Sequence, residues 1–259
     1  MTKWQRLRHV AAEAWLDLRV ALLQFTRFPV PAGEMPSPGR ARRGAWAWPV
    51  AGLLAGAAGA LAYWLAGSLG LPPLLAALLA VAAMVLATGA LHEDGLADFA
   101  DGIGGGRDRE SRLRIMRDSR LGSYGALALV LATLWRIAAL AALPPALAIP
   151  AILALAAAAR WSSALLAHAL PPANPDGQSA AAGRPGLPAL AAGLAACLLP
   201  ALLLPGALPV LPLLAALAAA AITGLLVRRA IGGQTGDALG TAAQGCEILG
   251  YGLILSLLP

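Results

Sequence analysis

Charged side chains are scarce in this chain, since Asp, Glu, Lys and Arg together make up 12% of its 259 residues. A typical soluble domain carries about twice that share. Hydrophobic residues instead make up 59% of the chain. The composition therefore excludes an ordinary soluble protein and favours one that is embedded in a membrane.

Cysteine and aromatic residues are also few. Cys197 and Cys246 lie in apolar surroundings and show neither CxxC spacing nor a neighbouring cluster of metal ligands, which argues against a disulfide framework and a zinc site. We expect both to be buried thiols. Lys and Arg number 19 against 13 Asp and Glu, but the aromatic content is 5% and the sequence contains no recognition module, so we expect no nucleic acid partner. The basic excess is typical of the cytoplasmic side of membrane proteins.

Seven stretches are long and apolar enough to cross a hydrocarbon core, which requires about 20 residues. The sequence therefore predicts an all-α, polytopic membrane bundle of about seven transmembrane helices, formed as a single domain over residues 1–259. Pro212 and Glu247 make the last two stretches the weakest. The predicted spans are residues 45–69, 74–91, 121–143, 146–170, 187–204, 210–227 and 238–258.

The first 28 residues differ from a secretory signal, because charged side chains interrupt the apolar run throughout. Apolar residues from Trp4 to Phe25 recur at helical spacing. We expect residues 1–28 to form an amphipathic helix that lies on the membrane surface, with its basic side chains toward the headgroups. An ordinary cytosolic helix is the alternative.

The distribution of charge predicts the topology. The turns at residues 70–73, 144–145 and 205–209 contain no charged residue, whereas Arg228, Arg229 and the long segment 92–120 are strongly charged. Because basic residues collect on the cytoplasmic side, we expect the three turns to face outward. The expectation is a multi-pass protein of the bacterial inner membrane, with its N-terminus and active site in the cytoplasm and its C-terminus outside.

Acidic residues concentrate in one place, since seven of the 13 fall between Glu93 and Asp118. Asp94, Asp98 and Asp101 are spaced i, i+4 and i+7, so a helix carries all three on one face within about 10 Å along its axis. Clustered carboxylates repel one another unless a cation bridges them, and Mg²⁺ accepts such hard oxygen ligands together with water and phosphate. We predict that these three residues are catalytic and bind Mg²⁺; a solvated acidic helix end is the alternative.

Glycine and arginine follow the acids directly. Residues 102–106 are nearly all glycine, and a row of arginines extends from Arg107 to Arg120. Backbone amides and guanidinium groups both bind phosphate, so we select Arg107, Arg117 and Arg120 as candidate phosphate-binding residues. Alternatively, the arginines only satisfy the preference for positive charge on the cytoplasmic side.

A second polar cluster covers residues 228–240. Gly232 and Gly233 would break the helix and let the backbone approach a ligand, and Asp237 could complete the metal shell from across the bundle. A simple turn between two helices is the alternative.

Two arginines, Arg136 and Arg160, lie inside predicted spans, where an unpaired charge is costly. Glu247 is the obvious intramembrane partner, and Arg160 is equally suited to contact a ligand. His92, just before the acidic run, could act as a base or metal ligand, but a histidine at a membrane boundary more often forms a hydrogen bond at a helix end.

Four segments together resemble the signature segments of the adenosylcobinamide-GDP ribazoletransferase family, also called cobalamin synthases. The central segment is long and specific, and the resemblance extends over nearly the whole chain. It adds Arg27 and Thr235, from the first and last segments, to the candidate substrate-binding residues. The segments are residues 26–31 (TRFPVP), 92–102 (HEDGLADFADG), 115–125 (IMRDSRLGSYG) and 232–240 (GGQTGDALG).

The resemblance implies a Mg²⁺-dependent membrane transferase that acts late in cobalamin biosynthesis, in the assembly of the nucleotide loop. Its partners would be adenosylcobinamide-GDP, α-ribazole or its 5′-phosphate, and the lipid bilayer, and GMP would be released. A homo-oligomer or an association with other cobalamin-assembly enzymes is compatible with this reading.

Other membrane proteins remain alternatives. The segment 98–102 imitates the start of the CDP-alcohol phosphotransferase motif, but the Ala-Arg pair and the later aspartates of that motif are missing. Prenyltransferases also bind a diphosphate through Mg²⁺. A secondary transporter is disfavoured, because the acids cluster near one membrane face rather than at its midplane.

Overall fold

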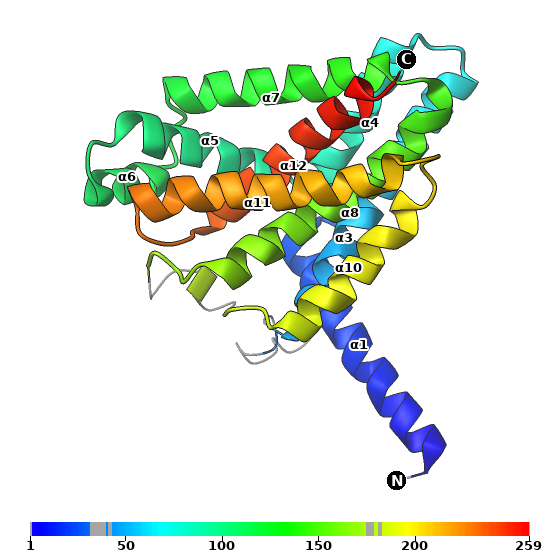
Figure 1. Ribbon diagram of the computed structural model, residues 1–259, viewed down its shortest axis with the longest axis horizontal. Helices are drawn as coiled ribbons and strands as arrows, with labels where there is room; N and C mark the ends of the chain where they lie inside the picture. Colours follow the sequence, from blue (N-terminus) through cyan, green and yellow to red (C-terminus); the bar gives the residue numbers. More distant parts are fainter. Residues whose placement is uncertain (1, 32–39, 41–42, 175–178, 181–182, 259) are drawn as a thin grey trace.

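The computed structural model describes residues 2–31, 40, 43–174, 179–180 and 183–258 (Figure 1). Within these ranges the protein is helical, and its one β-type contact is an isolated bridge between Pro172 and Gln234. The all-α class is confirmed. The helices are α1 (Lys3–Phe25), η1 (Gly44–Ala47), α3 (Trp48–Ser68), α4 (Pro73–Thr88), α5 (Leu91–Gly105), α6 (Arg109–Met116), α7 (Ser123–Ala142), α8 (Pro145–Ala169), α10 (Leu187–Ala201), η2 (Leu208–Val210), α11 (Leu211–Ala230) and α12 (Gly236–Ser256).

Helix α8 forms the centre of the bundle and packs against α3, α10, α11 and α12 (Figure 1). Most of its residues are buried, and the run of alanines at 156–159 leaves little side-chain bulk between neighbouring backbones. Gly52 of α3 lies so close to α8 that a Cβ on Gly52 would collide with the carbonyl oxygen of Ala156. Small residues therefore determine how closely the helices of the core approach each other.

Fewer helices than predicted have the length and composition of a membrane span. Among the described residues, four segments meet both requirements: Gly44–Ser68, Ser123–Ala142, Pro145–Ala169 and Leu208–Ala230. Helices α4 and α5 together add a fifth if that bent pair counts as one span. Helix α10, with 15 residues, and α12, which carries Asp237, Gln244 and Glu247, fall outside these requirements. The polytopic helical class is confirmed, and the number of about seven spans stays a prediction.

A sharp elbow separates α4 from α5, whose axes differ by 88°. Gly89 and Ala90 both have left-handed backbone angles, with φ of +65° and +59°, so neither residue can continue the helix. The predicted span 74–91 therefore ends at Thr88. The Arg27 side chain passes over Gly89 so closely that any Cβ there would collide with it. The elbow turns the acidic helix α5 across the bundle.

Helices α5 and α12 cross at two glycines. A Cβ on Gly95 would lie 3.1 Å from the Cα of Asp237, and one on Gly240 would lie 3.3 Å from the Cα of Gly95. The hydroxyl of Thr241 also donates to the carbonyl oxygen of Gly95 at 3.4 Å. This close crossing brings the start of α12 next to the carboxylates of α5.

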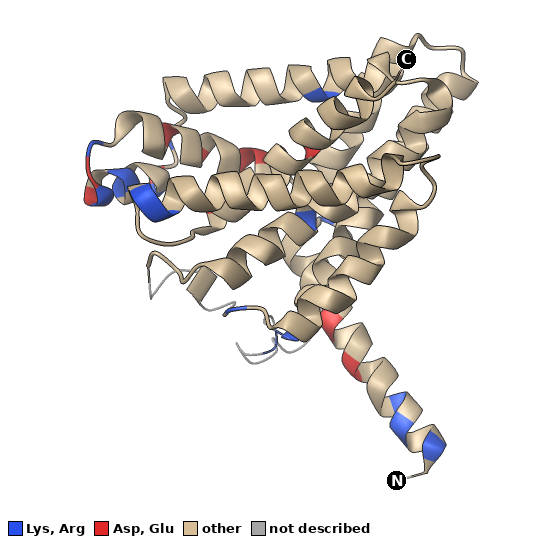
Figure 2. Cartoon of the chain, viewed as in Figure 1, with Lys and Arg blue, Asp and Glu red and all other residues tan. Residues whose placement is uncertain are grey.

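The charged and uncharged ends of the molecule are distinct. Figure 2 shows basic and acidic residues on α1, α5 and α6, whereas the end near the C-terminus is drawn in tan, the colour of the other residues. Leu143, Leu204 and Ile254 share one buried cluster there with the start of α4, so the three charge-free turns lie at the same end as the last turn of α12. This grouping is what a common membrane face requires.

Helix α1 projects away from the bundle (Figure 1). Its last turn is anchored, because Phe25 packs edge-on against Trp48 with ring centroids 5.1 Å apart. Trp4 near its start is 73% exposed, so an apolar face remains uncovered. The predicted helix is present from Lys3 to Phe25, and its location on a membrane surface stays a prediction.

We expect Gly95→Ala to destabilise the protein by about 1–3 kcal/mol, because the added methyl group would force α5 away from α12. Gly245→Ala is the matched control: its Cβ would meet Ala219 at an ordinary 3.5 Å, and it should be neutral or stabilise by up to about 1 kcal/mol. Thermal unfolding in detergent, followed by circular dichroism, measures both effects. Equal stability of the two variants would show that the crossing has room for a side chain.

Candidate functional site

Two adjoining cavities lie beside the elbow between α4 and α5. The elbow cavity has a volume of about 470 Å³, and the carboxylate cavity has a volume of about 280 Å³. Gln24, Leu91 and Asp94 line both, so the two cavities adjoin, and we call them together the recess. Arg27, Thr88 and Gly89 belong to the elbow cavity, and His92, Gly95, Ser163, Gly236, Asp237 and Gly240 belong to the carboxylate cavity.

Carboxylates from two helices approach each other at this recess. Asp94 is exposed, Asp98 is half-buried one turn further along α5, and Asp237 occupies the first turn of α12. Burial raises the pKa of Asp237 to about 6, and the negative charges of Asp98 and Asp94 act in the same direction. The Thr235 hydroxyl, which donates to Asp237 at 3.3 Å, partly offsets this. The three acids are therefore close enough to repel one another.

The carboxylates do not form a closed metal cage. Within the described part of the chain, no group of three His, Cys, Asp or Glu side chains is placed to hold a metal ion. Mg²⁺ does not need such a cage, since it commonly takes one or two carboxylates and completes its shell with water and substrate phosphate. The oxygen donors of Asp94, Asp98 and Asp237 fit that requirement.

Asp101 lies on the same helix but has a different contact. Its carboxylate accepts hydrogen bonds from the backbone N–H groups of Gly122 and Gly125, at 2.8 and 2.9 Å. It thus caps the start of α7, where the helix dipole favours a negative charge. A Cβ at either glycine would collide with the carboxylate. Both oxygens of Asp101 accept bonds that join α5 to α7, which gives this residue a structural role. Its role as a metal ligand stays a prediction.

The predicted phosphate-binding arginines separate into two groups. Arg27 lines the elbow cavity beside Asp94. Arg107, Arg117 and Arg120 are exposed and contribute to neither cavity. Arg120 is bonded to Asp118 and holds the pKa of that carboxyl at about 2.

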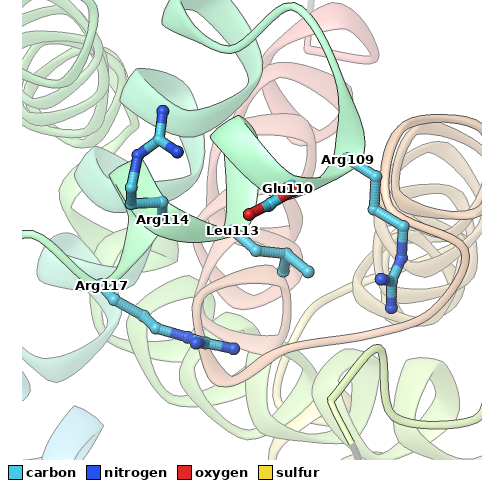
Figure 3. Close-up of a pocket in the computed structure, with 5 residues that line it drawn as sticks. All are labelled: Arg109, Glu110, Leu113, Arg114 and Arg117. Atoms are coloured by element: carbon cyan, nitrogen blue, oxygen red, sulfur yellow. The ribbon is translucent and has the colours of Figure 1, made fainter.

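A separate basic pocket of about 540 Å³ lies on α6. Figure 3 shows Arg109, Arg114 and Arg117 around Glu110 and Leu113. Arg109 also donates to the carbonyl oxygens of Ile231 and Ala173, at 3.0 and 2.6 Å, and so ties α6 to the end of α11. The arginine row of the sequence is thus partly structural.

The glycine-rich turn before α12 serves the fold. Gly232 has a left-handed φ of +80°, as is usual just after a helix, and Gly233 lies too close to the Pro171 carbonyl oxygen to accommodate a side chain. Thr235 caps α12, since its hydroxyl accepts from the N–H of Ala238 at 3.2 Å. These contacts favour the alternative of a turn between helices over direct ligand contact by the three residues.

Buried charges connect four helices beneath the recess. Arg136 of α7 binds Glu93 of α5 at 2.8 Å and Glu247 of α12 at 2.7 Å, and Arg160 of α8 binds Glu247 at 3.1 Å. Gln244 donates to Glu93 at 3.0 Å and accepts from Arg136 at 3.1 Å. We call these five residues the charge network. The predicted pairing with Glu247 is present, and the guanidinium of Arg160 lies in the network rather than in the cavity lining.

Glu93 was not predicted to belong to this network. The balance of charge could have indicated a second acid, because Glu247 alone leaves one of the two buried arginines without a negative partner. A second acid was therefore required near the same depth, and Glu93 is the acid that the elbow turns inward.

We expect Glu247→Gln to destabilise the protein by about 3–5 kcal/mol, because it leaves Arg136 and Arg160 buried without sufficient negative charge. Glu13→Gln is the control, since its ion pair with Arg40 is half exposed and is worth at most about 1 kcal/mol. Thermal unfolding of both purified variants measures the difference. A Glu247→Gln protein with wild-type stability would mean that water enters the network.

Comparisons with known proteins identify close relatives. A family model described as "Cobalamin-5-phosphate synthase" matches residues 17–255. A protein of Bradyrhizobium diazoefficiens is 48% identical over 248 residues, which cover 95% of this chain and 94% of the relative. A protein of Azorhizobium caulinodans is 50% identical, and the match covers 90% of this chain and 92% of the relative. One of Ralstonia nicotianae is 44% identical, and the match covers 94% of this chain and 96% of the relative. All three are named "Adenosylcobinamide-GDP ribazoletransferase". No solved structure matches the chain.

Proposed function

This chain belongs to the cobalamin-5-phosphate synthase family, and we infer that it catalyses the adenosylcobinamide-GDP ribazole transfer for which its relatives are named. The observation that carries the inference is a family match over residues 17–255, which includes every residue that lines the recess. The enzyme is a membrane transferase of cobalamin biosynthesis. The comparisons give no support to the CDP-alcohol phosphotransferase, prenyltransferase and transporter alternatives.

The reaction joins adenosylcobinamide-GDP to α-ribazole or to α-ribazole 5′-phosphate. A ribose hydroxyl oxygen forms a bond to the phosphorus atom that is attached to cobinamide. The bond from that phosphorus to the bridging oxygen breaks, and GMP leaves with the electron pair. The products are adenosylcobalamin, or its 5′-phosphate, and GMP. The attacking hydroxyl loses a proton, which Asp94 or Asp237 can accept because both line the carboxylate cavity.

We propose Mg²⁺ as the cofactor, which one or two of the carboxylates of Asp94, Asp98 and Asp237 would hold together with water and substrate phosphate. When bound, it would supply positive charge to the diphosphate oxygens as GMP departs. Burial and the negative charges of Asp98 and Asp94 raise the pKa of Asp237, and a cation at this position would offset both. Asp101 contributes indirectly by fixing α5 against α7.

The arginines have two proposed tasks. Arg27, which lines the elbow cavity beside Asp94, binds a phosphate of adenosylcobinamide-GDP. The exposed Arg107, Arg117 and Arg120 attract the anionic substrate to this end of the molecule without contacting the reacting phosphorus.

We expect Asp98→Asn to lower the rate of GMP release by several orders of magnitude, because it removes one negative ligand and keeps the shape of the side chain. Asp108→Asn is the control: Asp108 caps α6, a role that Asn also fills. Binding of Mn²⁺, followed by electron paramagnetic resonance, should weaken in Asp98→Asn only. Unchanged Mn²⁺ binding and a near-native rate in Asp98→Asn would place the metal elsewhere.

We also propose that the recess faces the cytoplasm of a bacterium with an inner membrane, and that the charge-free turns face outward. Single cysteines at Leu71 and Arg107 test this orientation, since both positions are exposed and the native Cys197 and Cys246 are buried. A membrane-impermeant maleimide should label Leu71→Cys in cells with a permeable outer membrane, and Arg107→Cys only after the inner membrane is opened. The reverse pattern would invert the topology.

A further inference from the structure

His92 has a fixed position in the wall of the carboxylate cavity. Its side chain is 2% exposed and stacks on Phe25, with ring centroids 5.9 Å apart and planes 18° apart. Both rings line the cavity. The imidazole is thus held in one plane beside Asp94 and Asp237.

The neighbouring arginine determines which ring nitrogen carries the proton. Nη2 of Arg160 lies 3.4 Å from Nδ1 of His92, and Arg160 is itself held by Glu247. A guanidinium group has only donors, so Nδ1 must be the acceptor. The ring proton is therefore on Nε2.

The resulting Nε2–H group has no hydrogen-bond partner in the described part of the chain, although the atom is buried. A buried donor without an acceptor is costly, and native proteins rarely keep one without a reason. Since Nδ1 is occupied by Arg160, Nε2–H is the ring donor that remains, on a residue that lines the carboxylate cavity. A protonated Nε2 can neither bind a metal ion nor accept a proton, which removes both functional roles considered for His92 from the sequence.

The cavity combines one fixed donor, His92, with two carboxylate acceptors, Asp94 and Asp237. A hydroxyl group matches this set, because it accepts through its oxygen and donates its own proton. The diphosphate would interact with these carboxylates only through the proposed Mg²⁺, and an apolar group would leave the Nε2–H unsatisfied. We propose that this cavity binds the attacking ribose hydroxyl of α-ribazole, whose oxygen accepts a hydrogen bond from His92 Nε2–H while its O–H donates one to the carboxylate of Asp94 or Asp237. The proposal rests on the proposed function and specifies the subsite for its second substrate.

Two variants of His92 separate a donor role from a packing role. His92→Gln can place its amide N–H near the position of Nε2, whereas the side chain of His92→Asn is too short to do so. The fluorescence of the benzimidazole group reports the binding of α-ribazole to the purified protein without metal or corrinoid. His92→Asn should weaken α-ribazole binding about tenfold or more, and His92→Gln should restore most of it.

The free benzimidazole base, which lacks the ribose, is the matched control ligand. The affinity of the free base should be the same for the wild type and both variants. In turnover assays, only the KM for α-ribazole should rise. The proposal is overturned if His92→Asn binds α-ribazole normally, if binding of the free base weakens equally, or if the change falls on the KM for adenosylcobinamide-GDP. A wild-type protein that releases no GMP would instead refute the proposed function.

Discussion

Two arginine side chains buried in an apolar bundle have to be neutralised inside the protein, and much of the architecture follows from this constraint. Arg136 and Arg160 come from α7 and α8, whereas the acids that neutralise them come from α5 and α12. No pair of adjacent helices could satisfy the network alone. The four helices therefore have to meet at one place, and the recess lies where they meet.

Helix α5 owes its importance to the different directions in which its polar residues point. Glu93 enters the charge network, Asp94 lines both cavities, and Asp101 caps α7. One short helix thus links the interior of the bundle to its polar recess. Because Gly95 allows α12 to pass so closely, Asp237 joins the same group from a distant part of the sequence.

The sequence was sufficient to predict the helical class, the helix that carries the acids and the pairing of the arginines with Glu247. The elbow could not be predicted, because a left-handed alanine such as Ala90 has no sequence signature and is stabilised only by the surrounding fold. The capping role of Asp101 was hidden for a related reason: helical spacing shows which residues share a face, but not which partner that face meets.

The size of the recess has a consequence for the larger substrate. Sites that enclose drug-sized ligands have volumes of about 300–1,000 Å³. The two cavities, of about 280 and 470 Å³, lie just below and inside that range, and a corrin macrocycle exceeds a drug-sized molecule. Under the proposed function, only the phosphate-bearing arm of the corrinoid would enter the recess in this conformation, while the ring would stay outside. Recognition of the macrocycle would then be spatially separate from bond formation, and the finished cofactor would depart by withdrawing one arm.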